Sequence, residues 1–122
     1  MKTQQIADRL VELCRAGEYE RCYDELYAED AESIEMPAMA GGAIGDARGL
    51  AAIRAKSKAW SDGVEAIHDS VVGDPQVAGN WFCVPMSLDV TFKDGRRVRM
   101  DELCVYQTRE GRIVREQFFY DL

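Results

Sequence analysis

The chain has 122 residues, and its 22 acidic and 15 basic side chains give a formal net charge of −7. This length fits a single domain over residues 1–122, large enough to fold without a disulfide or metal staple. Because 47% of the residues are hydrophobic, a disordered chain is excluded. The acidic balance argues against nucleic acid and anionic membranes as partners, since both repel a negative surface.

The composition also bears on the compartment and on metals. No apolar stretch is long enough for a transmembrane helix, and the charged first segment lacks the apolar core of a signal peptide. Four cysteines without a CxxC pair, beside a single histidine, predict no zinc site. We expect reduced thiols and a cytoplasmic location, with a Cys14–Cys22 redox pair as the alternative.

Two short helices are predicted at the start of the chain. Apolar residues recur at helical spacing over residues 6–14, and Gly17 ends that helix. A second stripe begins at residue 19 and predicts a helix that ends at residues 30–31. Alternation over residues 33–36 then predicts a short strand, which Pro37 closes.

A glycine-rich run over residues 38–49 predicts a loop, and its spacing matches no phosphate-binding motif. A third helix is predicted over residues 50–60, with Ile53 and Trp60 on its apolar face. Its basic side chains are expected on the solvent side: Arg54, Lys56 and Lys58.

From residue 63 onward the hydrophobic period changes to two, which indicates strands. Four antiparallel strands are predicted, over residues 64–72, 77–92, 96–108 and 112–121. The strand over residues 77–92 has the clearest alternation, so it should have one dry and one more polar face. The order of elements predicts an α+β fold in which a strongly curved antiparallel sheet wraps three helices as a cone, with a pocket at its open end.

The strand over residues 96–108 carries an irregularity. Val98 and Met100 share one parity, whereas Leu103 and Val105 share the other. One inserted residue near residues 101–102, a β-bulge, would reconcile the two patterns and re-aim one acidic side chain. The alternative is a strand that is buried on both faces near its middle.

Several stretches carry a family resemblance: AGEY at residues 16–19 with LYAEDA at 26–31, GLAAI at 49–53, and EGRIV at 110–114 with FFYD at 118–121. Across essentially the whole chain they resemble the nuclear transport factor 2-like superfamily, which includes ketosteroid isomerases, SnoaL-type polyketide cyclases and limonene epoxide hydrolases. The resemblance implies a cone-shaped α+β barrel, chemistry without a cofactor, and a homodimer through the outer sheet face. On that face we expect the polar side chains of Ser87, Asp89 and Thr91 at the interface.

Neither known catalytic set of this superfamily is complete here. Ketosteroid isomerases use an Asp base with a Tyr and a protonated Asp as donors. By the resemblance the base falls at Met36, the Tyr near Leu10, and the second Asp within residues 101–103, so at most one of three matches. The Arg-x-Asp pair of the epoxide hydrolases is similar to residues 99–101, but their last-strand Asp falls at Phe118.

Other polar groups are nevertheless candidates for catalysis. Glu116, Phe118 and Tyr120 share the face of the last strand that, by the resemblance, lines the cone. A carboxylate between apolar neighbours suits a general acid or base, and Tyr120 could donate a hydrogen bond to a carbonyl oxygen. Glu102 would face Glu116 if the bulge turns it inward, and Asp101 depends on the same bulge.

His68, the only histidine, is a further candidate because histidine titrates near neutral pH. Its partner would have to come from another strand, with Glu102 or Glu116 the best placed. The alternative for His68 is a structural or exposed residue. For the two glutamates it is a salt bridge to Arg99 or Arg115, or exposure at the rim.

An apolar small-molecule ligand is the expected partner, held by Met36, Trp60, Met86, Met100 and Phe118. Met39 is expected at the same rim, and methionine suits loose, adaptable apolar binding. These residues predict a cofactor-independent isomerase, cyclase or hydrolase that uses pocket carboxylates for proton transfer. Two alternatives remain open, a non-catalytic ligand-binding protein and a dimerisation module with a vestigial pocket.

Overall fold

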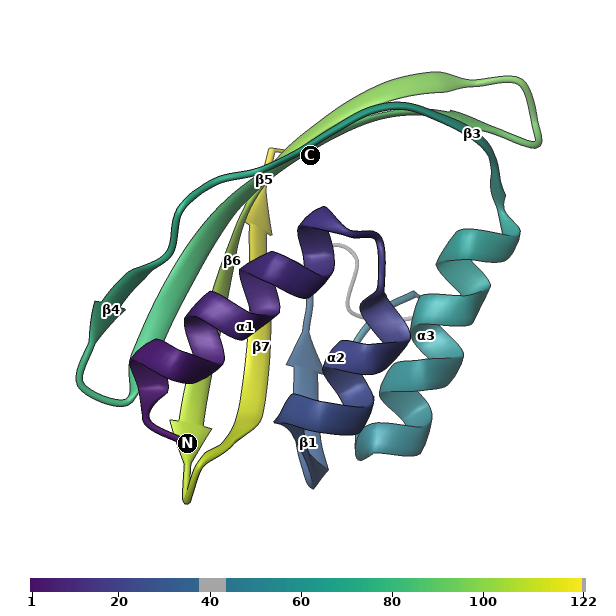
Figure 1. Cartoon of the computed structure of the whole chain (residues 1–122). Coiled ribbons are helices and arrows are strands. Elements are labelled where there is room, and N and C mark those ends of the chain that lie inside the picture. Colours follow the sequence, from purple (N-terminus) through teal and green to yellow (C-terminus); the bar gives the residue numbers. More distant parts are fainter. Residues whose placement is uncertain (38–43, 122) are drawn as a thin grey trace.

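A computed structural model describes residues 1–37 and 44–121 of the chain. Its elements, in chain order, are α1 (Thr3–Arg15), α2 (Tyr19–Leu26), β1 (Tyr27–Ile34), β2 (Ala47–Arg48), α3 (Leu50–Asp62), β3 (Val64–Val72), β4 (Gln76–Ala78), β5 (Trp81–Phe92), β6 (Arg97–Arg109) and β7 (Arg112–Tyr120). The sheet curves around α1, and α2 and α3 lie beyond α1 (Figure 1). The expected α+β fold is therefore confirmed.

The strands form one mixed sheet in the order β2-β1-β7-β6-β5-β3, with β4 paired to β5. The strands from β3 onward are antiparallel, as predicted, whereas β1 runs parallel to β7. This parallel pairing brings the segment after α2 beside the last strand of the chain. The sheet is not closed into a barrel, because its two edge strands, β2 and β3, do not pair with each other.

The predicted end of the second helix was wrong. α2 ends at Leu26, and Tyr27 has the extended backbone angles φ −92° and ψ 144°. The segment predicted as helix up to residue 31 belongs to β1, whose pairing with β7 outweighs the local helical pattern. Tyr27 still packs edge-on against Tyr23, with ring centroids 5.0 Å apart.

Two further strand predictions were wrong. The strand expected over residues 77–92 is a hairpin of β4 and β5, which turns at Gly79 (φ 58°) and Asn80. No bulge lies near residues 101–102, because β5 and β6 pair in continuous register from Trp81↔Gln107 to Thr91↔Arg97. The even-numbered residues of β6 therefore face the helices, whereas Leu103 lies on the outer face and is 40% exposed.

Part of the glycine-rich loop predicted over residues 38–49, including Met39, lies outside the described residues. Residues 47 and 48 form β2, which pairs with Glu32 and Ser33 of β1. The third helix is confirmed and runs two residues beyond the predicted end. No helix within the described ranges is long and apolar enough to cross a membrane.

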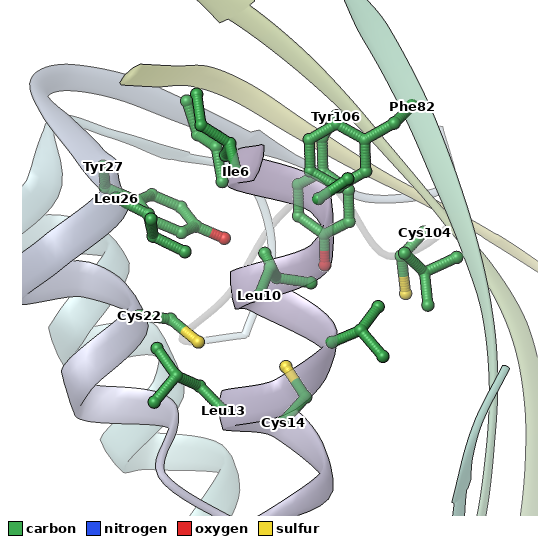
Figure 2. Close-up of a cluster of buried hydrophobic side chains, with 14 of the residues drawn as sticks. Ile6, Leu10, Leu13, Cys14, Cys22, Leu26, Tyr27, Phe82, Cys104 and Tyr106 are labelled. Carbon is green, nitrogen blue, oxygen red and sulfur yellow. The ribbon is translucent and has the colours of Figure 1, made fainter. Parts of the chain in front are cut away.

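The core lies where α1 packs against the inner face of the sheet (Figure 2). Leu10 is buried, and the rings of Phe82 and Tyr106 stack with centroids 4.7 Å apart. Cys14 and Cys22 are buried free thiols on α1 and α2. This packing fills one end of the sheet's inner face and leaves the other end to the polar residues described below.

Candidate functional site

Polar side chains from three strands and one helix gather on the inner face of the sheet. This inner-face cluster consists of Tyr27, Ser33, Glu35, Lys56, Glu102, Glu116 and Tyr120. Glu102, Glu116 and Tyr120 were predicted as site residues. The other four members were not, because their positions depend on how β1 pairs with β7 and on how α3 is rotated.

Glu116 is the most deeply buried acid of the inner-face cluster, with 5% of its surface exposed. One carboxylate oxygen accepts a hydrogen bond from the Tyr27 hydroxyl, and the other accepts one from Ser33 Oγ at 2.7 Å. Burial raises the pKa of Glu116, and the bonds from Ser33 and Tyr27 oppose that rise. The alternative considered for Glu116, a salt bridge to Arg115, is not formed, since Arg115 pairs with Glu32 on the outer face.

Lys56 enters the inner-face cluster from α3 rather than facing solvent as predicted. Its Nζ donates to Ser33 Oγ at 2.7 Å and lies 3.3 Å from a carboxylate oxygen of Glu35. The ammonium also lies over the Phe118 ring, 5.1 Å from the ring centroid. Lys56 follows the buried Ile53 by three positions, so its stem lies on the apolar side of α3. That spacing is the signal that could have identified it.

Glu35 directly follows β1 and lies at the edge of the cluster. Its two oxygens face Lys56 and the Tyr120 hydroxyl, which donates at 3.3 Å. Burial raises the pKa of Glu35 above its ordinary value, and the charge of Lys56 and the hydrogen bonds from Lys56 and Tyr120 only partly oppose that rise. Glu35 therefore combines a half-buried position with a local cation.

Glu102 faces inward without the predicted bulge, between Met86 on β5 and Tyr120 on β7. Its hydrogen-bond partner is the Cys104 thiol, with Sγ 3.6 Å from Oε1. Burial raises the pKa of Glu102, and the negative charges of Glu35 and Glu116 raise it further. Among the residues that the structure describes, no basic side chain forms an ion pair with it.

Comparison with known proteins places this chain in a family. The family model of the SnoaL-like domain matches residues 1–120. The chain belongs to this family. No protein of curated function matches it.

Solved structures agree with this SnoaL-like assignment. A proposed SnoaL-like polyketide cyclase from Mesorhizobium loti is 33% identical over 98% of this chain and 100% of its own, with a TM-score of 0.89. A proposed isomerase from Bacillus subtilis is 17% identical over 99% of this chain and 90% of its own, with a TM-score of 0.76. TerC, co-crystallised with polyporic acid, is 16% identical over 98% of this chain and 91% of its own, with a TM-score of 0.77. The last two share the fold.

Two predicted site residues of the SnoaL-like domain lie away from the inner-face cluster. Asp101 is on the outer face, where it accepts a hydrogen bond from Ser87 Oγ at 2.7 Å and pairs with Arg99. His68 is exposed, with Nε2 2.7 Å from Thr91 Oγ1. The pairing of β3 with β5 shifts register twice, once before His68 and once at His68 itself, which breaks the parity from which an inward position was inferred.

The predicted apolar lining is half-buried: Met36, Trp60, Met86, Met100 and Phe118. By contrast, Val84 and Cys104 on the same inner face are fully buried near α1. The inner face of the SnoaL-like domain is thus filled at one end and partly open to solvent at the other. Two surface clefts, of about 490 and 400 Å³, lie elsewhere, beside the start of α1 and beside the α1–α2 turn.

The inner-face cluster offers carboxylate oxygens but no recognisable metal site. Within residues 1–37 and 44–121, no group of three or more His, Cys, Asp or Glu side chains is arranged to hold a metal ion. The chemistry that the cluster can perform with its own groups is proton transfer and hydrogen bonding.

Proposed function

We propose that this SnoaL-like protein binds an apolar carbonyl compound at the open end of its sheet and moves a proton on it without a cofactor. One observation carries the proposal: Glu35 and Glu102 belong to one cluster but have opposite surroundings. Glu35 faces a cation and a hydroxyl donor, whereas Glu102 lies between Met86 and Tyr120 with only a thiol as its donor. Such a difference separates the pKa values of two carboxyl groups and divides the roles of acid and base.

In the proposed reaction Glu102 is the acid and Glu35 the base. The Glu35 carboxylate removes a proton from the carbon next to the substrate carbonyl. The C–H electron pair forms a carbon–carbon double bond, and the carbonyl π pair moves to the oxygen, which takes the proton of Glu102. When the oxygen returns that proton and, in a β,γ-unsaturated substrate, Glu35 delivers its own to the γ-carbon, the double bond moves into conjugation with the carbonyl and both glutamates are restored.

Neighbouring side chains support this assignment of roles. Tyr120 lies opposite Glu102 across the β6–β7 pair, and its hydroxyl donates to Glu35, so it orients the base beside the acid. The half-buried Met86, Met100 and Phe118 supply apolar contact for the substrate body. The Mesorhizobium loti relative is described as a SnoaL-like polyketide cyclase, and polyketides carry carbonyl groups.

A ligand screen with matched variants tests the proposal. Apolar carbonyl and epoxide compounds would be screened by thermal shift with wild type, Glu102→Gln and Asp101→Asn, and the compounds that bind would be tested for turnover. We expect turnover in wild type and Asp101→Asn and a loss of roughly 100-fold or more in Glu102→Gln. Binding without turnover in wild type would contradict proton transfer and favour the ligand-binding alternative.

We also propose that the protein forms a homodimer through the outer face of the sheet. Large apolar side chains are exposed on that face: Trp81 (44%), Leu103 (40%) and Phe119 (42%). Leu103 and Phe119 lie directly opposite each other on β6 and β7. Burial of this apolar surface would be the main favourable term for association.

A further inference from the structure

The inner-face cluster holds three glutamates around one lysine, and the arrangement of its hydrogen bonds is directional. The titratable and polar groups that face Lys56 or the glutamates around it come from every neighbouring element: Tyr23 on α2, Tyr27, Ser33 and Glu35 from β1 and its end, Glu102 and Cys104 on β6, and Glu116 and Tyr120 on β7. Lys56 is the one cation that contacts the described members of this cluster. How it is bonded decides where the protons reside.

A lysine ammonium can only donate hydrogen bonds. Ser33 Oγ accepts from Lys56 Nζ at 2.7 Å, so the single hydroxyl proton of Ser33 is free to point to Glu116, 2.7 Å away. The Tyr27 hydroxyl donates to the other oxygen of Glu116. Hydrogen bonds donated to both oxygens stabilise the anionic form of a carboxyl group.

Glu35 has the same pattern. One oxygen lies 3.3 Å from Lys56 Nζ and the other accepts from the Tyr120 hydroxyl at 3.3 Å. Glu102 differs, because its donor is the Cys104 thiol at 3.6 Å, and a thiol is a weak donor. Three negative charges so close to one positive charge would repel one another, so the carboxyl group with the weakest donors is the one to keep a proton.

We propose that Lys56 is a positioning residue, which holds Glu35 as an anion directly and Glu116 as an anion through Ser33, and so leaves the proton of the cluster on Glu102. In terms of the proposed function, on which the catalytic meaning of this inference rests, Lys56 prepares one base and one acid in the same cluster. The effects of burial and of the Lys56 charge on the three glutamates agree with this role. Burial raises the pKa of all three glutamates; the charge of Lys56 opposes that rise in each, and only at Glu35 does Lys56 add a hydrogen bond.

Direct titration of the carboxyl groups tests the inference without any substrate. The side-chain carboxyl ¹³C resonances of the wild-type protein would be followed by NMR as pH is varied. We expect Glu102 to hold its proton to a higher pH than Glu35 and Glu116. If either of the other two titrates above Glu102, the inference is overturned. Because this measurement needs no variant, a folding defect cannot obscure it.

Variants of α3 then identify Lys56 as the cause. In Lys56→Met the titration midpoints of Glu35 and Glu116 should move to higher pH, and in Lys56→Arg, which keeps the charge, they should stay close to wild type. Lys58→Met is the matched control, since Lys58 lies two residues away, is 75% exposed and pairs with Asp62. Unchanged midpoints in Lys56→Met would refute the role of Lys56. Expected titrations without turnover of any ligand would instead refute the proposed function alone.

Discussion

Lys56 on α3 and Glu35 at the end of β1 form an ion pair with a Nζ–Oε1 distance of 3.3 Å, and only 11% and 13% of their side chains are exposed. The pair joins the helix layer to the sheet at the open end of the inner face. Exposed ion pairs contribute little to stability, but a covered pair leaves an uncompensated charge when one partner is removed.

Lys56→Met should lower the free energy of unfolding at neutral pH by about 3–5 kcal/mol, because Glu35 and Glu116 lose their cation while they remain buried. The loss should shrink as pH falls, since protonation removes the uncompensated charges. Urea unfolding at several pH values measures both effects. The exposed Lys58→Met should stay within about 0.5 kcal/mol of wild type. An equal loss in both variants would contradict the buried role of Lys56.

Glu102→Gln should become more stable relative to wild type as pH rises. Burial raises the pKa of Glu102 above its unfolded value of 4.5, so the stability that the protonated group contributes is lost as pH rises through the folded pKa. Glutamine has no such loss. The difference in the free energy of unfolding between the two proteins should therefore grow above about pH 4.5 and then level off.

Asp101→Asn, one residue away, should show the opposite trend. Hydrogen bonds from Ser87 and Arg99 lower the pKa of Asp101 below 3.8, so its contribution to stability is lost as pH falls through the folded value. Removal of this carboxylate should cost stability at neutral pH and nothing at strongly acid pH. If both variants moved in the same direction with pH, the inward position of Glu102 and the outward position of Asp101 would be refuted.

Tyr27→Phe should destabilise the protein by roughly 1–3 kcal/mol, because it removes a hydroxyl donor from an oxygen of the buried Glu116. Tyr120→Phe is the comparison, since its hydroxyl donates over 3.3 Å to the more accessible Glu35 and should cost less. Chemical denaturation of both variants measures the difference. An effect of Tyr120→Phe as large as that of Tyr27→Phe would contradict the account of the buried hydrogen bonds.

Part of this site could be predicted from the sequence because alternation in a strand is local. Glu116, Phe118 and Tyr120 share a face whatever the pairing of β7, so their common inward side was inferred correctly. Glu102 has the same parity as Met100 and is inward without any bulge. The order of helices and strands, together with the motifs at both ends of the chain, was sufficient to predict the fold of the family.

The rest of the site depends on contacts between distant segments. Ser33 and Glu35 enter the cluster because β1 pairs in parallel with β7, which no local pattern predicts. Lys56 enters because of the rotation of α3 against that edge. For His68 the local parity was misleading, since two register shifts in β3 bring its side chain to Thr91 on the outer face.

Leu103→Glu should convert the proposed homodimer to a monomer, because it places a charge among the exposed apolar side chains of the outer face. Sedimentation equilibrium measures the mass of the species directly. Ala51→Glu on the exposed side of α3 is the control and should leave the dimer intact. A wild-type protein that is already monomeric at all concentrations would contradict this interface.

The most direct test of the proposed proton transfer is exchange of substrate hydrogen in D₂O. A carbonyl compound that binds in the thermal-shift screen would be incubated with wild type, Glu35→Gln and Glu32→Gln, and deuterium at the carbon next to the carbonyl would be followed by NMR. Glu32 is the control because it pairs with Arg115 on the outer face. We predict catalysed exchange in wild type and Glu32→Gln, and a rate lower by roughly 100-fold or more in Glu35→Gln with binding retained. Exchange at the wild-type rate in Glu35→Gln, or no catalysed exchange of any bound compound, would contradict the account.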